Sequence, residues 1–133
     1  LMDVIDWDAN VDPKFKEHRF MRPIVDKEDD KHKEEWICYK SKLACAKRLT
    51  VYPGQTVTVK DSAAYGFILI EGHGKFGKWD IETPTLIRYG ELTNDEFFVT
   101  EKAAKKGITI TNESKTENIV MLKHFAENPD LKF

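Results

Sequence analysis

The sequence contains few cysteines and histidines, little net charge and no long apolar run, and each scarcity excludes a class of protein. Its 133 residues include 21 Lys and Arg against 23 Asp and Glu, which gives a net charge of -2 at pH 7. This balance offers no electrostatic basis for binding nucleic acid or an anionic membrane surface, so we expect neither as a partner. The longest apolar runs, at residues 67–70 and 119–122, are far shorter than the ~20 residues of a membrane-spanning helix.

The two cysteines, Cys38 and Cys45, indicate reduced thiols rather than a disulfide framework. They flank a polar turn at Ser41 and Lys42, and a two-residue turn there would place them directly opposite each other on paired strands. The first six residues carry acid where an export signal needs positive charge and an apolar stretch, so the cytoplasm is the expected compartment. The chain begins with Leu1 rather than Met, which suggests a domain cut from a longer protein.

The N-terminal part of the sequence is more acidic than the rest. Residues 1–35 contain 11 acidic and seven basic residues, a net of -4, whereas the remaining 14 basic and 12 acidic residues give +2. The charged run at residues 26–35 has no apolar residue and is typical of a solvated loop or a short exposed helix. The apolar residues before it are too many for a disordered tail, so we expect residues 1–35 to form an arm that packs on the body or on a second subunit.

Short apolar runs separated by Gly, Pro, Asn and Asp follow from Trp36 onward, spaced by about ten residues, as in an antiparallel sandwich or barrel. One helix is expected over residues 101–106, with Thr100 as its N-cap and Gly107 as its end. The sequence thus predicts three parts: the arm at 1–35, a barrel at 36–127 and a tail at 128–133. The strands are expected at residues 36–40, 43–45, 49–52, 56–60, 65–70, 85–89, 96–99, 108–111 and 118–125.

Familiar catalytic motifs do not fit this sequence. Residues 72–77 match the letters of G-x-G-x-x-G, but an early proline and the lack of a helical stripe after them favour a glycine-rich turn over a nucleotide site. No serine stands in G-x-S-x-G. No metal-binding pair arises from the four histidines, which are His18, His32, His73 and His124.

Two stretches resemble a known family. Residues 47–55 (KRLTVYPGQ), followed by 67–74 (FILIEGHG), resemble the first conserved motif of the cupin superfamily, and the first of them is especially similar to cupins of the mannose-6-phosphate isomerase type. Residues 90–99 and 107–122 resemble the second motif, with Asn112 as its asparagine. The resemblance covers roughly residues 36–126 and implies an all-β double-stranded β-helix, or jelly roll, preceded by the arm.

The sequence departs from the metal-binding members of this family. Those members carry H-x-H and a glutamate in the first motif and a further histidine in the second. The corresponding first-motif positions are Val59, Asp61 and Tyr65 in one register, or Lys60 and Ser62 in the other, and neither register supplies a histidine pair. The second-motif position has no histidine either. We therefore expect a metal-free cupin without a cofactor, since one carboxylate cannot hold a divalent metal.

Strand alternation predicts what fills the barrel. If Asp61 points inward, Tyr65, Phe67 and Leu69 do so as well, which gives an apolar and aromatic pocket with one carboxylate, suited to a sugar or another small organic ligand. The equal alternative is a closed core filled by its own side chains, with Asp61 capping a turn. The candidate ligand-binding residues are Asp61, Tyr65, Phe67, Lys60, Arg88 and His124.

The leading interpretation is a metal-free cupin domain, a degenerate domain of a tandem-cupin or sugar-isomerase-like protein, that serves assembly or binds a carbohydrate-like ligand. Its expected partner is a second copy in a homodimer or a neighbouring cupin domain. The alternative is an active sugar or sugar-phosphate isomerase of the mannose-6-phosphate isomerase type. In that case a base or a phosphate-holding group would come from Asp61, Lys60, Tyr65, Arg88 or His124.

Overall fold

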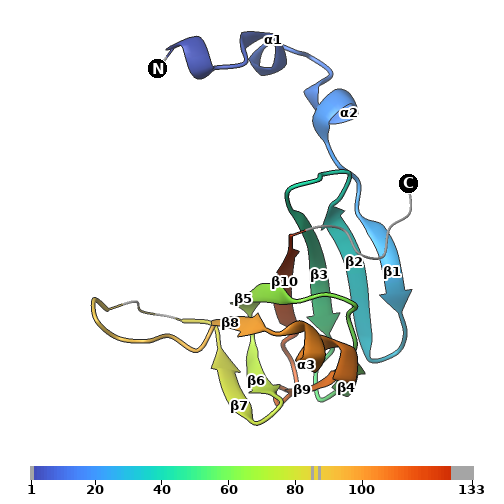
Figure 1. The fold of residues 1–133 in the computed structure, drawn as a ribbon, viewed down its shortest axis with the longest axis vertical. Helices are drawn as coiled ribbons and strands as arrows, with labels where there is room; N and C mark the ends of the chain where they lie inside the picture. Colours follow the sequence, from blue (N-terminus) through green and yellow to red (C-terminus); the bar gives the residue numbers. More distant parts are fainter. Residues whose placement is uncertain (1, 85, 87, 127–133) are drawn as a thin grey trace.

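Two antiparallel sheets form the body of the protein in the computed structural model, which describes residues 2–84, 86 and 88–126 (Figure 1). The larger sheet has six strands in the order β1-β2-β3-β10-β5-β8, and the smaller has four in the order β4-β9-β6-β7. The predicted all-β class is therefore confirmed. The predicted tail at 128–133 lies outside the described residues.

The strands of the larger sheet are β1 (Ile24–Glu28), β2 (His32–Cys38), β3 (Cys45–Val51), β5 (Tyr65–Glu71), β8 (Glu96–Val99) and β10 (Ile119–Phe125). Those of the smaller sheet are β4 (Thr56–Val59), β6 (His73–Phe76), β7 (Trp79–Glu82) and β9 (Ile108–Asn112). The helical segments are the 3-10 turn η1 (Met2–Val4) and the helices α1 (Trp7–Asn10), α2 (Phe15–Arg19) and α3 (Glu101–Lys106).

Helix α3 forms where the sequence predicts it. The Thr100 hydroxyl accepts a hydrogen bond from the backbone N–H of Ala103 at 3.4 Å, and Gly107 ends the helix at a φ of 96°. Such a positive φ suits glycine, which has no Cβ. No helix within the described residues is long and apolar enough to cross a membrane.

The charged run at residues 26–35 is not a solvated loop or a helix, which corrects the sequence-based expectation. It forms most of β1 and the first half of β2, and both Glu34 and Glu35 are buried. The strand accommodates these charges because cations face them; Glu35, for example, accepts a 2.7 Å hydrogen bond from Arg48 of β3. The predicted boundary between residues 35 and 36 falls inside β2, so the segment before the first sheet strand ends at residue 23.

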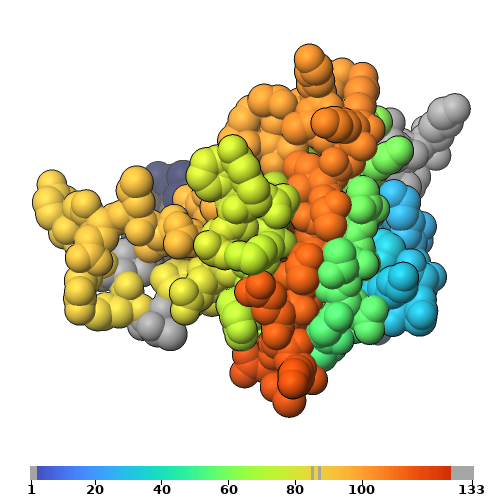
Figure 2. Space-filling view, turned by 90° about the horizontal axis from the view of Figure 1, so that it is seen from below, coloured from blue at the N-terminus to red at the C-terminus, as the bar shows by residue number. Residues whose placement is uncertain are grey.

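Two further strand expectations change. Residues 73–82 form the β6–β7 hairpin; the glycine-rich turn is predicted by the sequence, but the two strands that flank it are not. Leu86, Arg88 and Tyr89 of the expected strand at 85–89 are not in a strand, and residues 85 and 87 lie outside the described residues. The segment between β7 and β8 instead extends away from the body (Figures 1 and 2).

The cysteines do not face each other. Cys38 pairs with Ala46 rather than with Cys45, because the register between β2 and β3 shifts after Trp36 and the connection is longer than two residues. The Cys38 thiol donates to the carbonyl of Ala44 at 3.7 Å.

The core lies between the two sheets and is strongly aromatic. Phe67 of the larger sheet contacts Phe76 of the smaller sheet, with ring centroids 4.5 Å apart, and stacks on Phe97 at 5.3 Å. Tyr65 packs on Phe125 at 5.4 Å toward the other end of the same layer. The inward direction predicted for the alternate residues of β5 is confirmed, and their own side chains fill this space.

Helices α1 and α2 lie beyond the end of the larger sheet and bury none of their residues (Figure 1). Where the arm joins the body, the Tyr39 hydroxyl donates to the carbonyl of Arg22 at 2.6 Å. Trp7, Phe15 and Phe20 are left exposed. These two helices therefore do not pack on the body, which was one of the two arrangements that the sequence allows.

The close pairing of β6 and β9 gives a first prediction. A Cβ at Gly74 would lie 2.1 Å from the backbone oxygen of Thr111, so we expect Gly74→Ala to displace the strands and to lower the free energy of unfolding by about 1–3 kcal/mol. Gly66→Ala is the control, because its Cβ would meet nothing closer than 3.9 Å. Urea denaturation of both variants tests this, and an equal effect at the two positions would contradict it.

Candidate functional site

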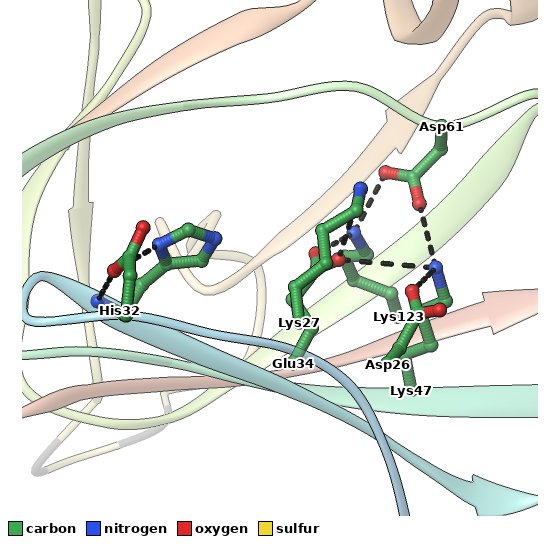
Figure 3. A network of polar contacts seen from close by, with 8 residues as sticks. Asp26, Lys27, His32, Glu34, Lys47, Asp61 and Lys123 are labelled. Atoms are coloured by element: carbon green, nitrogen blue, oxygen red, sulfur yellow. Dashed lines mark hydrogen bonds and ion pairs between the residues drawn. The ribbon is translucent and has the colours of Figure 1, made fainter.

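The barrel interior contains a network of buried ionic groups (Figure 3). The Lys123 Nζ lies 2.6 Å from Glu34 Oε1 and 2.7 Å from Asp61 Oδ2. All three side chains are at most 1% exposed. These are short, charge-assisted contacts in a region from which water is excluded.

Lys47 extends the network. Its Nζ lies 2.7 Å from Asp26 Oδ2, 3.5 Å from Asp61 Oδ1 and 3.8 Å from Glu34 Oε2. Asp61 therefore contacts a different lysine with each of its two oxygens. Lys27, whose side chain is half exposed, approaches Glu34 Oε2 from the surface at 3.7 Å. The six groups, Asp26, Lys27, Glu34, Lys47, Asp61 and Lys123, carry three formal charges of each sign and are here called the interior ion network.

Strand register explains why two lysines meet inside the barrel. Lys47 of β3 and Lys123 of β10 are direct cross-strand partners, so their side chains lie on the same face of the sheet. Like charges at such positions repel, and the anions that offset this repulsion come from β2, where Glu34 lies, and from the β4–β5 connection, where Asp61 lies. The Asp61 backbone N–H donates to the carbonyl of Ala104 at 3.2 Å, which fixes that connection to α3.

Aromatic rings enclose the two ammonium groups. Lys47 Nζ lies 4.6 Å from the centroid of a Trp36 ring, and Lys123 Nζ lies 5.1 Å from that of Tyr65. Phe125 lies 6.0 Å from both nitrogens. Ring faces attract cations at these distances, and the rings also exclude water. Glu34 Oε2 is buried and has no hydrogen-bond partner.

The surroundings shift two pKa values. Burial alone would lower the pKa of Lys47, but the charges of Glu34 and Asp61 and the contact with Asp26 outweigh it and raise that pKa above its ordinary value. Burial raises the pKa of the Tyr65 hydroxyl, and the negative charges of Asp61 and Glu34 raise it further. The folded protein thus holds Lys47 charged and Tyr65 neutral.

The interior does not fit a divalent metal. Among the residues that the structure describes, no three or more His, Cys, Asp or Glu side chains are grouped so that they could hold one. Of the family's metal-ligand positions, Val59 is apolar, and Asp61 already receives an ammonium group on each oxygen. A metal cation placed here would face Lys47 and Lys123, which repel it.

The six residues predicted for a ligand site are not gathered together. Asp61, Tyr65 and Phe67 lie in the interior. Lys60 and His124 are exposed, and Arg88 lies at the surface beside Glu91, 3.8 Å away. The interior placement of these last three is therefore corrected.

The alternation of β10 explains the error at His124. Lys123 and Phe125 are the buried residues there, so the histidine between them points outward. The sequence reading did not identify Lys47, Lys123 or Glu34. Lys123 shares the period-two pattern of the buried residues Met121 and Phe125, and that pattern was the available signal.

A groove on the surface is the other candidate site. It lies between the turn of the β6–β7 hairpin and the β8–α3 segment and has a volume of about 550 Å³. Figure 2 shows these two segments on one face of the molecule. Lys78 and Lys106 give it positive charge, and its lining also includes Trp79, Phe97, Phe98 and Ile108. We call it the basic groove.

Comparison with known proteins identifies the fold. No family model matches the chain, and no curated protein matches it. Among solved structures, it is similar to an RmlC-like cupin protein from Ralstonia eutropha JMP134 (TM-score 0.52, 8% identity, 79% of this chain and 64% of that one). It is also similar to a cupin 2 domain-containing protein from Halorhodospira halophila (TM-score 0.53, 12% identity, 84% and 81%).

A third similar structure is the Lactobacillus farciminis oxalate decarboxylase in a formate complex (TM-score 0.55, 19% identity, 80% of this chain and 31% of that one). The chain thus matches less than two thirds of the Ralstonia protein and about a third of the decarboxylase. These likenesses show that the chain has the cupin jelly-roll fold, as the sequence motifs predict. A fold alone does not define an activity, and the finer resemblance to the mannose-6-phosphate isomerase type stays a prediction.

The pKa shifts predict how stability changes with pH. Lys47 and Tyr65 both have raised pKa values in the folded state, so folding retains protons that the unfolded chain loses above their ordinary values of 10.5 and 10.0. We therefore expect the free energy of unfolding to fall as the pH rises from 10.0 through 10.5 and beyond, which urea denaturation at each pH measures. Tyr65→Phe should make this fall shallower, and an unchanged pH dependence in that variant would contradict the assignment.

Proposed function

We propose that this chain is a metal-free cupin domain that serves assembly rather than metal-dependent chemistry. The interior ion network is the observation that carries this proposal. Lys47 and Lys123 supply fixed positive charge in the barrel, and the interior carboxylates already neutralise it. The interior carboxylates therefore need no metal cation to balance their charge. Aromatic side chains surround the interior ion network.

The closed interior also bears on the ligand and on the alternative activity. A carbohydrate-like ligand would have to bind at the surface, since Tyr65 and Phe67 are packed in the core. An isomerase needs a base and an electrophile on one substrate, whereas Lys60, Arg88 and His124 are exposed and Asp61 is buried. The thiol groups of the cysteines agree with a cytoplasmic protein, which we propose as its compartment.

We expect the purified protein to contain less than stoichiometric zinc, iron, manganese or nickel by elemental analysis. A coupled assay with mannose-6-phosphate or fructose-6-phosphate should show no turnover, whether or not metal is added. Stoichiometric metal would contradict the metal-free proposal. Turnover that survives chelation would instead favour the isomerase alternative.

The assembly that we propose is a homodimer in which the arm of one copy binds the basic groove of the other. The first ten residues contain three aspartates and no Lys or Arg. They also carry the exposed apolar side chains of Val4, Ile5 and Trp7. The basic groove offers the complementary surface, with lysines at its edge and aromatic rings in its lining. Charge complementarity favours this pairing, and burial of the apolar side chains stabilises it.

Charge reversal tests the proposed dimer. We expect the double variant Lys78→Glu and Lys106→Glu to weaken self-association about tenfold or more, which corresponds to at least roughly 1.4 kcal/mol, as measured by analytical ultracentrifugation. Lys102→Glu, on α3 but outside the groove lining, is the matched control and should associate like the unaltered protein.

A charge swap adds a positive test. Mixing the groove double variant with the arm variant Asp3→Lys and Asp8→Lys should restore association between the two, because the charges are then complementary in the opposite sense. An unaltered protein that stays monomeric at every concentration would contradict the proposed dimer.

A further inference from the structure

Three residues of the interior ion network have the composition and spacing for forming a covalent bond between side chains. Lys123 Nζ lies 2.7 Å from Asp61 Oδ2, and the Asp61 carboxyl carbon is bonded directly to that oxygen. A second carboxylate, Glu34, contacts the same nitrogen at 2.6 Å. All three side chains are fully or almost fully buried, and the rings of Tyr65 and Phe125 lie beside the nitrogen.

We propose that Lys123 and Asp61 join in an intramolecular amide bond, with Glu34 as the catalytic residue. The bond would link β10 to the β4–β5 connection. It arises from the chain's own residues alone, and it depends on neither the metal content nor the oligomeric state proposed above.

The reaction balances without any other reactant. A proton first passes from Lys123 Nζ to Asp61 Oδ2 within their hydrogen bond, which gives a neutral amine and a neutral carboxylic acid. The nitrogen lone pair then attacks the Asp61 carboxyl carbon. A second proton passes from the nitrogen to Glu34 and from Glu34 to the departing hydroxyl group. The C–O bond breaks, one water molecule leaves, the amide remains, and Glu34 returns to its original state.

Burial favours each of these steps. A low dielectric medium makes two neutral groups less costly relative to an ion pair than they are in water. The fixed contact replaces a bimolecular encounter, and reacting groups held about 3–3.5 Å apart react far faster than free ones. Exclusion of water also protects the amide from hydrolysis. Glu34 is suited to carry the proton because its Oε1 lies 2.6 Å from the Lys123 nitrogen and the side chain is fully buried.

The geometry favours this pair over the two pairs that Lys47 forms with Asp61 and Asp26. The contact of Lys47 with Asp61 is longer, at 3.5 Å, and its short contact is with Asp26, which is partly exposed to water. After the reaction, Lys27 and Lys47 still balance Asp26 and Glu34, so no buried charge is left without a counterion.

Mass spectrometry of the folded, full-length protein tests the proposal directly. We expect the denatured protein to be lighter than its sequence mass by one water molecule in most molecules after prolonged incubation of the native state. Tryptic digestion should yield a branched peptide in which Asp61 is joined to Lys123, with cleavage after Lys123 blocked. A folded protein that retains its full sequence mass would overturn the proposal, as would water loss mapped to a different pair of residues.

Two variants separate the chemistry from simple packing. Glu34→Gln keeps the size of the side chain but cannot accept the proton as a carboxylate does, and it should slow amide formation by about a hundredfold or more. Lys47→Arg keeps a buried cation next to the pair and should still form the amide. Circular dichroism establishes that each variant is folded. A folded Glu34→Gln variant that loses water at the unaltered rate would remove Glu34 from the proposed mechanism.

Discussion

The arrangement of the body depends on the neutralisation of buried charge. Moving an ion out of water costs several kcal/mol even after the protein relaxes around it, so the interior lysines are tolerable only with carboxylates in direct contact. Those carboxylates come from segments far apart in the chain: Glu34 lies 89 residues from Lys123, and Asp61 lies 62 residues from it. The network therefore constrains β2, β3, β10 and the β4–β5 connection at once.

This constraint explains the least expected element of the fold. Most of a ten-residue run without an apolar side chain forms sheet strands, because two of its acidic side chains contact the interior lysines. Glu34 contacts Lys123 directly, and Asp26 contacts Lys47 from the edge of the same sheet. With these contacts the charged strands β1 and β2 complete the sheet beside β3. Without them, Asp61 alone would offset the charges of the two paired lysines on β3 and β10, and like charges at directly paired positions destabilise a sheet.

Short-range sequence patterns, such as strand alternation and helix capping, predicted the elements that depend mainly on neighbouring residues. Alternation along β5 placed Tyr65 and Phe67 correctly in the core, and capping residues placed α3 at 101–106. The same reasoning failed where long-range pairing decides the outcome. A lysine is usually exposed, so residue type alone predicts an exposed Lys123. Its burial is possible only because Glu34 and Asp61, which are distant in the sequence, neutralise its charge. Val120 is buried as well, although it belongs to the opposite alternation from Lys123 and Phe125. A parity argument that starts from Val120 therefore points His124 inward, which is wrong.

Aromatic residues lie both in the core and on the arm, and this distribution determines which surfaces are available for binding. In the described part of the chain, paired ions and packed rings occupy the interior of the jelly roll, so the proposed recognition uses the outer surface. Trp7 on α1, Phe15 on α2 and Phe20 just after α2 are about half exposed or more, and the two helices bury none of their residues in the single chain. Burying apolar surface yields about 25 cal/mol per Å², and acidic residues beside it favour a positively charged acceptor. These properties of the arm support its proposed binding to the basic groove of a second copy.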